Sequence, residues 1–168
     1  MFQGELSLEL KDPVDEDIVR SGFCGLQYRC PSPLPTAMYA GVKLKLKSDG
    51  RSYRLNLRGT SWNPHELHVG FLEQMPAERW VEATLRFEDF LPTSEGKMKL
   101  IRGRALQGQM ISSIGVTLCD ELEGPFQLAI ASIEFVPQLT KRFPTSVEID
   151  DNSSPHLQIP RKDSSFAF

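Results

Sequence analysis

Apolar and polar side chains alternate along much of the chain between Phe2 and Val136. A repeat of two residues is typical of a β-strand with one buried face, because successive side chains point to opposite sides of a sheet. Gly- and Pro-containing turns separate the alternating segments, and no long helical repeat interrupts them. The pattern therefore predicts an all-β fold, a two-sheet antiparallel β-sandwich or jelly roll.

The alternation also indicates which side chains share a face of each strand. Apolar residues gather on one face in three segments: Leu6, Leu8 and Leu10; Leu67, Val69 and Phe71; and Val81, Ala83, Leu85 and Phe87. Residues 111–119 are interpreted as a buried strand. In the last long strand the apolar positions shift by one residue after Ile130, which predicts a β-bulge near Ala131 and Ser132.

Residues 42–58, VKLKLKSDGRSYRLNLR, have the pattern of a β-hairpin. Asp-Gly between two alternating runs is the sequence of a type I′ turn, which needs a positive φ at both central residues. With Asp49 and Gly50 in the turn, the predicted inward pairs are Leu46–Tyr53, Leu44–Leu55 and Val42–Leu57. The outward face would then carry Lys43, Lys45, Lys47, Arg54, Asn56 and Arg58, with Arg51 beside the turn. Lys45 would lie opposite Arg54, so like charges would meet across the strands.

Proline-rich segments predict one loop within the domain and contribute to the expected end of the domain. Three prolines within residues 31–38 predict a crossing loop in place of a strand. Residues 1–136 are predicted to form the β-sandwich domain. Residues 137–168 have no repeat and are rich in Ser and Pro, so they are expected to be a C-terminal tail that is extended or disordered.

Length and charge restrict the class of protein. The chain has 168 residues, enough for one domain with a substantial core, and a net charge of −3. An acidic chain is a poor candidate for nucleic-acid binding, so we expect no nucleic-acid partner. No apolar run approaches the length of a membrane helix, and the first residues resemble a strand, not a targeting signal. Cys24, Cys30 and Cys119 lack disulfide or zinc spacing, which favours a reducing compartment.

The candidate metal-binding and catalytic residues are weak. His65 and His68 are three positions apart on a predicted strand, so their rings should face opposite sides and be surface side chains, not ligands. Asp120, Glu121 and Glu123 could offer oxygen atoms to calcium, but an exposed acidic turn is the better interpretation. No nucleophile elbow or phosphate-binding loop is present. We therefore predict no catalytic residue, no metal site and no cofactor.

Aromatic residues offer an alternative function. β-Sandwich domains that bind sugars place aromatic rings on a concave face, and Trp62 lies in a predicted loop next to Asn63 and Pro64. Trp80 and Tyr53 are interpreted as core residues with a polar tip. A carbohydrate-binding module therefore remains the competing hypothesis, and Trp62 is a candidate contact residue under either one.

Four segments resemble, in order, the complex I intermediate-associated protein 30 family, which comprises assembly factors of mitochondrial NADH:ubiquinone oxidoreductase. The segments are 20–26, 39–58, 79–92 and 111–136, so the resemblance covers about residues 2–136. Its strongest marks are Asp49-Gly50-Arg51 with Tyr53, Trp80 with Phe87 and Phe90, and Ser113-Ile114-Gly115 leading to Asp120 and Gly124-Pro125-Phe126.

The resemblance implies a galactose-binding-domain-like sandwich and a role as a non-enzymatic chaperone. It implies binding to an early membrane-arm intermediate of complex I in the mitochondrial matrix, alongside other assembly factors and early membrane-arm subunits. Peripheral contact with the inner membrane is part of the same expectation. Family members begin with a targeting leader and an Asp-Val-Val-Met-Gly-Gly-Ser-like segment, which this chain lacks. We expect the missing first strand to leave an exposed edge or a gap in one sheet.

The cations of residues 42–58 provide the candidate docking site. We predict that a cation patch contacts an acidic partner or anionic lipid headgroups, and that it consists of Lys43, Lys45, Arg51, Arg54 and Arg58 with Trp62 as an apolar anchor. In the alternative interpretation these are solvated strand residues that Glu5, Glu9 or Glu82 of neighbouring strands neutralise.

Overall fold

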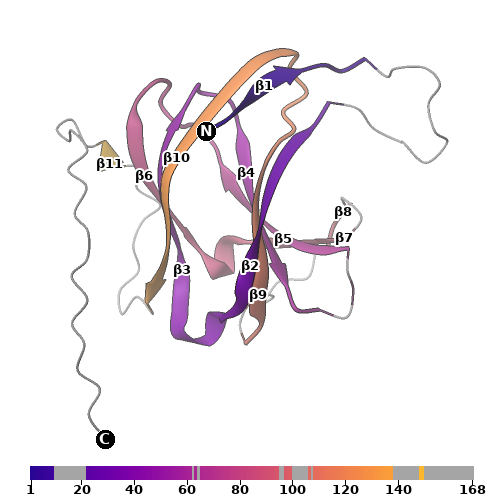
Figure 1. Cartoon of the computed structure of the whole chain (residues 1–168), viewed down its shortest axis with the longest axis vertical. Helices are drawn as coiled ribbons and strands as arrows, with labels where there is room; N and C mark the ends of the chain where they lie inside the picture. The colour runs from indigo at the N-terminus through magenta and orange to yellow at the C-terminus, as the bar shows by residue number, and fades with distance from the viewer. Residues whose placement is uncertain are drawn as a thin grey trace, which may run out of the picture.

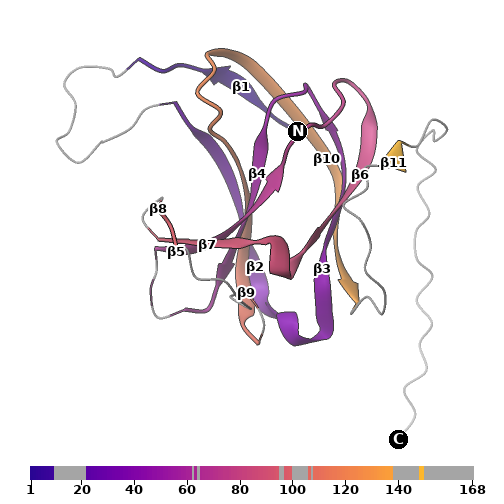
Figure 2. The same cartoon turned by 180° about the vertical axis from the view of Figure 1, so that it is seen from behind.

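The fold is a sandwich of two antiparallel β-sheets (Figure 1). The computed structural model describes residues 1–9, 22–61, 63, 65–94, 97–99, 106, 108–137 and 148–149. Sheet A has the order β1-β10-β3-β6-β11, and sheet B has the order β2-β9-β4-β5-β7-β8. Figure 2 shows the same two layers from behind, with β3, β6 and β10 in one layer and β2, β9, β4 and β5 in the other. The predicted all-β sandwich is confirmed.

The strand boundaries follow the alternating segments of the sequence. Sheet A consists of β1 (Phe2–Leu6), β3 (Tyr39–Ser48), β6 (Trp80–Arg86), β10 (Gly124–Pro137) and β11 (Glu148–Ile149). Sheet B consists of β2 (Cys24–Pro35), β4 (Tyr53–Gly59), β5 (Glu66–Leu72), β7 (Leu91–Ser94), β8 (Lys97–Met98) and β9 (Met110–Leu118). Two 3₁₀ turns, Thr36–Met38 and Phe87–Asp89, lie at points where the chain changes sheets.

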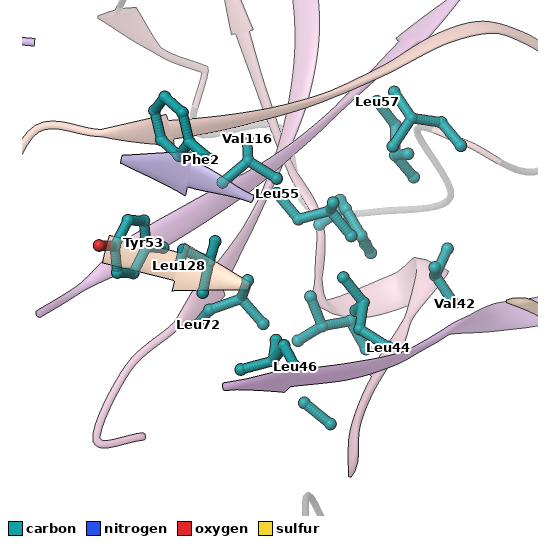
Figure 3. Packing of buried hydrophobic residues seen from close by; sticks show 14 of the residues in the cluster. Phe2, Val42, Leu44, Leu46, Tyr53, Leu55, Leu57, Leu72, Val116 and Leu128 are labelled. Carbon is teal, nitrogen blue, oxygen red and sulfur yellow. The ribbon is translucent and has the colours of Figure 1, made fainter. Parts of the chain in front are cut away.

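The core lies between the sheets and is built from the inward residues of both layers (Figure 3). Leu44 and Leu46 of β3 and Leu55 and Leu57 of β4 are completely buried. The predicted inward set Val81, Ala83, Leu85 and Phe87 is also buried. The β-bulge is confirmed, because the register of β10 against β3 shifts between Ile130 and Ser132.

The predicted hairpin of residues 42–58 is wrong, although its inward residues are correct. β3 pairs with β10 and β6, whereas β4 pairs with β5 and β9, so the two strands belong to opposite sheets. Gly50 has a φ of 91°, but Asp49 is not among the residues with positive φ, so a type I′ turn does not form. The same alternation suits an arch between two sheets, in which both runs face one core from opposite sides. Lys45 and Arg54 therefore do not face each other.

Three other expectations need correction. The Pro-rich segment is not only a loop, since Leu34 and Pro35 still pair with β9, and the register breaks between Arg29 and Leu34. An edge strand with an interrupted register tolerates prolines, because their missing N–H groups are not needed by a neighbour. Leu67, Val69 and Phe71 face outward, because His68, Gly70 and Leu72 oppose the inward residues of β4. Trp80 lies opposite Lys47 on the outer face and is 39% exposed.

The ends of the described chain bear on two further expectations. Among the described strands, the edges of sheet A are β1 and β11, and the edges of sheet B are β2 and β8. Leu26 and Tyr28 of β2 oppose the inward residues of β9, yet they are 55% and 62% exposed. At the other end β10 includes Pro137, and Glu148–Ile149 pair with β6, while most of residues 138–168 lie outside the described residues. The extended or disordered tail stays a prediction.

Two crossovers between the sheets meet at one end of the sandwich. The chain passes from sheet A to sheet B between β3 and β4, and from sheet B to sheet A between β9 and β10. Arg51 of the first crossover binds Asp120 of the second through two hydrogen bonds, Nε to Oδ2 at 2.8 Å and Nη2 to Oδ1 at 2.6 Å. Its Nη1 also donates to the carbonyl oxygens of Gly124 and Pro125, and its Nη2 donates to that of Leu122.

Asp49 extends this network, which we call the crossover clamp, to the core. Its Oδ2 accepts a hydrogen bond from the backbone N–H of Gln127 at 2.7 Å. The hydroxyl group of the buried Tyr53 donates to the same carboxylate. Burial, followed by the charge of Asp49, raises the pKa of Tyr53. The clamp consists of Asp49, Arg51, Tyr53 and Asp120, and it joins both crossovers through nearly buried groups.

We predict that Asp120→Asn strongly destabilises the fold. The side chains of Arg51 and Asp120 are only 12% and 8% exposed, so the substitution leaves a buried guanidinium without its counter-ion. Removing one partner of a buried pair costs about 3–5 kcal/mol, which urea denaturation would measure. The control is Glu121→Gln, which neutralises an exposed carboxylate in the same turn. Equal stability of Asp120→Asn and the wild type would contradict the clamp.

The clamp also predicts a pH dependence of stability. The hydrogen bonds from Arg51 hold the pKa of Asp120 below its usual range, against the opposing effect of burial. Because the pKa is lower in the folded state, this stabilisation is complete above the unfolded pKa of about 4 and is lost as the pH falls through the folded pKa. We expect the difference in unfolding free energy between the wild type and Asp120→Asn to shrink below about pH 4. A difference that stays constant down to pH 2 would contradict this assignment.

Candidate functional site

The residues of the predicted cation patch do not form one surface. Lys43 and Lys45 lie on the outer face of sheet A, and Arg54 and Arg58 lie on the outer face of sheet B. Arg51 belongs to the crossover clamp, and Trp62 lies outside the described residues. The predicted patch assumed that β3 and β4 pair as a hairpin. That pairing is wrong, because the two strands belong to opposite sheets.

The lysines of sheet A are largely neutralised by their neighbours. Lys43 forms an ion pair with Glu82 at 2.5 Å, and Lys47 forms one with Glu78 at 2.8 Å. Lys45 lies opposite Glu82 in the register of β6. The alternative interpretation, in which Glu82 of a neighbouring strand neutralises these cations, is confirmed for Lys43. The outer face of sheet A therefore mixes both signs of charge.

The outer face of sheet B has a different charge distribution. Glu66 is the one carboxylate residue within the ranges of the six described strands of this sheet. Its carboxylate accepts a hydrogen bond from Ser61 and forms an ion pair with Lys99, and both contacts lower its pKa. Arg54 lies over the ring of Phe71, with 5.7 Å between its guanidinium carbon and the ring centroid. Cations thus predominate on the outer face of sheet B.

The registers of β2, β9 and β4 arrange nine outward positions in three rows. The rows are Arg29–Ser113–Arg58, Gln27–Gly115–Asn56 and Gly25–Thr117–Arg54. Three of the four corners are arginines, and the centre is a glycine. Among the described residues, none of the three arginines takes part in an ion pair. The arrangement joins Arg54 and Arg58 of the predicted patch to Arg29, which the sequence did not single out.

Glycine at the centre leaves a hollow in this face. The hollow has a volume of about 240 Å³, and its lining residues are Gly25, Leu26, Gln27, Asn56, Arg58, Leu67, Ser113, Gly115 and Thr117. We call it the sheet B hollow. A Cβ atom on Gly115 would lie 2.9 Å from the carbonyl oxygen of Leu26, so the backbones of β9 and β2 approach too closely there for a side chain.

Hydrogen bonds fix the polar side chains around the hollow. The amide nitrogen of Gln27 donates to the hydroxyl oxygen of Ser113 at 2.7 Å, across β2 and β9. The amide nitrogen of Asn56 donates to the hydroxyl oxygen of Thr117 at 2.6 Å, across β4 and β9. Because both hydroxyl oxygens act as acceptors in these bonds, their own O–H groups are left to donate elsewhere. Each amide nitrogen also keeps a second N–H.

Arg58 is the charged residue of the hollow. Its Nε atom is buried and has no hydrogen-bond partner among the described residues. A buried N–H group without a partner costs free energy, so such groups in native proteins generally have a ligand, a water molecule or a functional reason. The hollow therefore combines one guanidinium whose Nε–H has no hydrogen-bond partner among the described residues with several neutral donors. This set of donors suits a ligand that accepts hydrogen bonds.

Sequence reasoning missed most of this site. The interpretation of β2 and β9 from the sequence rested on their apolar residues. The polar residues Gln27, Ser113 and Thr117 were therefore not singled out. Asn56 was placed outward correctly, but on the wrong sheet surface. The available signal was the SxGxT spacing of residues 113–117, in which outward hydroxyls flank an outward glycine. That spacing acquires meaning only once β2 and β4 are known to flank β9.

The other candidates from the sequence fall in separate places. His65 is exposed, whereas His68 is buried in β5 and faces the core, so the expectation of two surface histidines is wrong for His68. Asp120 serves the crossover clamp, and Glu123 accepts a hydrogen bond from the backbone N–H of Leu8. Within the described ranges, no three His, Cys, Asp or Glu side chains are grouped as a metal site would require. No described helix has the length and apolar character needed to cross a membrane.

Comparison with known proteins identifies the family of the chain. Residues 1–130 match the family model for complex I intermediate-associated protein 30. The chain is 32% identical over 139 residues to the mitochondrial complex I intermediate-associated protein 30 of Neurospora crassa, covering 77% of this chain and 48% of that protein. It is 27% identical over 140 residues to the mouse protein of the same name, covering 77% of this chain and 42% of that protein.

The chain spans about half the length of these curated relatives. The family model nevertheless covers the described strands from β1 to the first half of β10. Four of the residues that carried the resemblance in the sequence build the crossover clamp: Asp49, Arg51, Tyr53 and Asp120. The chain belongs to the complex I intermediate-associated protein 30 family.

Proposed function

We propose that this chain is a non-enzymatic assembly factor for mitochondrial respiratory complex I. The observation that carries the proposal is its membership of the family, together with the names of the fungal and mouse relatives, which are mitochondrial and associated with complex I intermediates. The geometry is compatible with this role. Arg51 and Asp120, two of the marks of the family resemblance, bind each other and are nearly buried. The outer sheet faces are therefore the surfaces open to contact with other proteins.

The proposal extends to the partner and the compartment. We place the chain in the mitochondrial matrix, peripheral to the inner membrane, bound to an early membrane-arm intermediate together with other assembly factors. Arg54 and Arg58 are retained as partner-binding residues because they lie on the face where cations predominate. Lys43 and Lys45 are weaker candidates, since Glu82 lies beside both. Trp62 stays a candidate apolar anchor on sequence grounds.

Affinity capture tests the proposed function. The full chain, tagged after Phe168 and expressed in mitochondria, should recover membrane-arm subunits of complex I and fail to recover subunits of other respiratory complexes. Quantitative mass spectrometry of the captured material is the measurement. Recovery of no complex I subunit above an untagged control, with the chain folded and present in mitochondria, would contradict the proposed function.

Charge reversal separates the two faces in the same capture experiment. We expect Arg54→Glu to reduce the recovery of complex I subunits, because it reverses a charge on the cation-rich face of sheet B. Lys47→Glu, on the outer face of the opposite sheet, is the matched control and should leave recovery near the wild-type level. A loss with Lys47→Glu alone would assign the docking face to sheet A, in contradiction to our choice.

A further inference from the structure

We propose that the sheet B hollow binds carboxylate side chains of an acidic, extended segment of a partner protein. This inference rests on the proposed function, because it names the surface and the chemistry through which such an assembly factor would hold its partner. It goes further by assigning the contact to Arg58 and the polar residues around Gly115.

The hydrogen-bonding capacity of the lining favours an acceptor. The hydroxyl oxygens of Ser113 and Thr117 already accept bonds from the two amides, so their O–H groups, the second amide N–H groups and Arg58 remain as donors. An ionised carboxylate is acceptor-only and matches the planar fork of a guanidinium in two parallel hydrogen bonds. The unpartnered Nε of Arg58 is one arm of such a fork.

The absence of acidic residues from the lining strengthens this choice. The described residues around the hollow include one cation, Arg58, and no Asp or Glu. A sugar hydroxyl both donates and accepts, and sugar sites usually add an aromatic platform. No aromatic residue in the described part of the chain lines the hollow. A carboxylate therefore uses this set of groups more completely than a neutral sugar does.

The shape of the surface favours an extended segment over a free anion. Arg54 and Arg58 are four residues apart on β4, a distance of about 13 Å along a strand. Acidic residues four positions apart in an extended segment have the same spacing, so a segment lying along β4 can place one carboxylate at each arginine. Arg29, across Ser113 from Arg58, adds a third cation at the rim. A single small anion would use only one of these groups.

A titration of the full chain with two peptides tests this inference. The probes are a ten-residue peptide that alternates glutamate and threonine and a matched peptide that alternates glutamine and threonine. We expect the acidic peptide to shift the NMR signals of Arg58 Nε–H and of the side-chain amides of Gln27 and Asn56, with an affinity that falls as salt is added. The neutral peptide should leave these signals unchanged. Equal shifts with both peptides would overturn the inference.

Variants of the hollow assign the effect to its residues. Arg58→Gln should weaken binding of the acidic peptide about tenfold or more, because a charged hydrogen bond is lost. Gln27→Glu, on the exposed edge strand, should abolish binding by placing a carboxylate in the hollow. Lys47→Gln, which removes a cation from the outer face of the other sheet, is the control and should have little effect. If Arg58→Gln and Gln27→Glu both bind like the wild type while remaining folded, the inference is wrong.

Two further arms separate other ligands and the proposed function. Galactose or inorganic phosphate in place of the peptide should leave the hollow signals unchanged. Shifts with either of them and none with the acidic peptide would overturn the inference in favour of a sugar or free-anion site. In the mitochondrial capture experiment, recovery of complex I subunits by the wild type but not by Arg58→Gln supports the inference. Equal recovery by both overturns it and leaves the proposed function intact, whereas no recovery by the wild type refutes the function itself.

Discussion

Arg51 and Asp120 hold together two of the places where the chain changes sheets. One crossover joins β3 of sheet A to β4 of sheet B, and the other joins β9 of sheet B to β10 of sheet A. Without a contact between these loops, burial of apolar side chains alone would press the two layers together at this end. The guanidinium also binds carbonyl oxygens of the second crossover, so it satisfies backbone groups that the turn exposes. This ion pair and the hydrogen bond from Gln127 N–H to Asp49 join the start of β4 to the start of β10.

The outer faces of the two sheets differ in charge. Arg51 and Asp120 are nearly buried in the clamp, so they contribute to neither face. On sheet A the lysines of β3 lie beside Glu82 of β6 and Glu78, which precedes β6, so the surface is mixed. On sheet B the strands that flank β9 bring arginines around a glycine, and the strands supply almost no acid. A protein with a net charge of −3 thus carries a local cation-rich surface.

Alternation in the sequence predicted which side chains are buried more reliably than it predicted which strands are neighbours. Leu44, Leu46, Leu55 and Leu57 face the core as expected, because a period of two fixes the face of a strand in any β-sandwich. The same period cannot tell a hairpin from an arch, and β3 has both edges occupied by β10 and β6.

The candidate site depends on which strands are neighbours, and alternation in the sequence does not predict this. Arg54 and Arg58 were identified from their charge, but their surroundings come from β2 and β9, which are far from them in the sequence. The role of Gly115 also required the register, since only the close approach of Leu26 shows why a side chain is excluded there. The clamp was visible in the sequence as separate family marks, Asp49-Gly50-Arg51 and Asp120, without any sign that they meet.

The central claim is that the outer face of sheet B is the surface that contacts the partner. Arginine-specific modification with phenylglyoxal, read by mass spectrometry, measures this directly on the free chain and on the chain captured with its partner. The account predicts that modification of Arg29, Arg54 and Arg58 falls in the captured complex, while modification of the exposed Arg79, which precedes β6 of sheet A, is unchanged. Protection of Arg79 with full modification of the three sheet B arginines would contradict it.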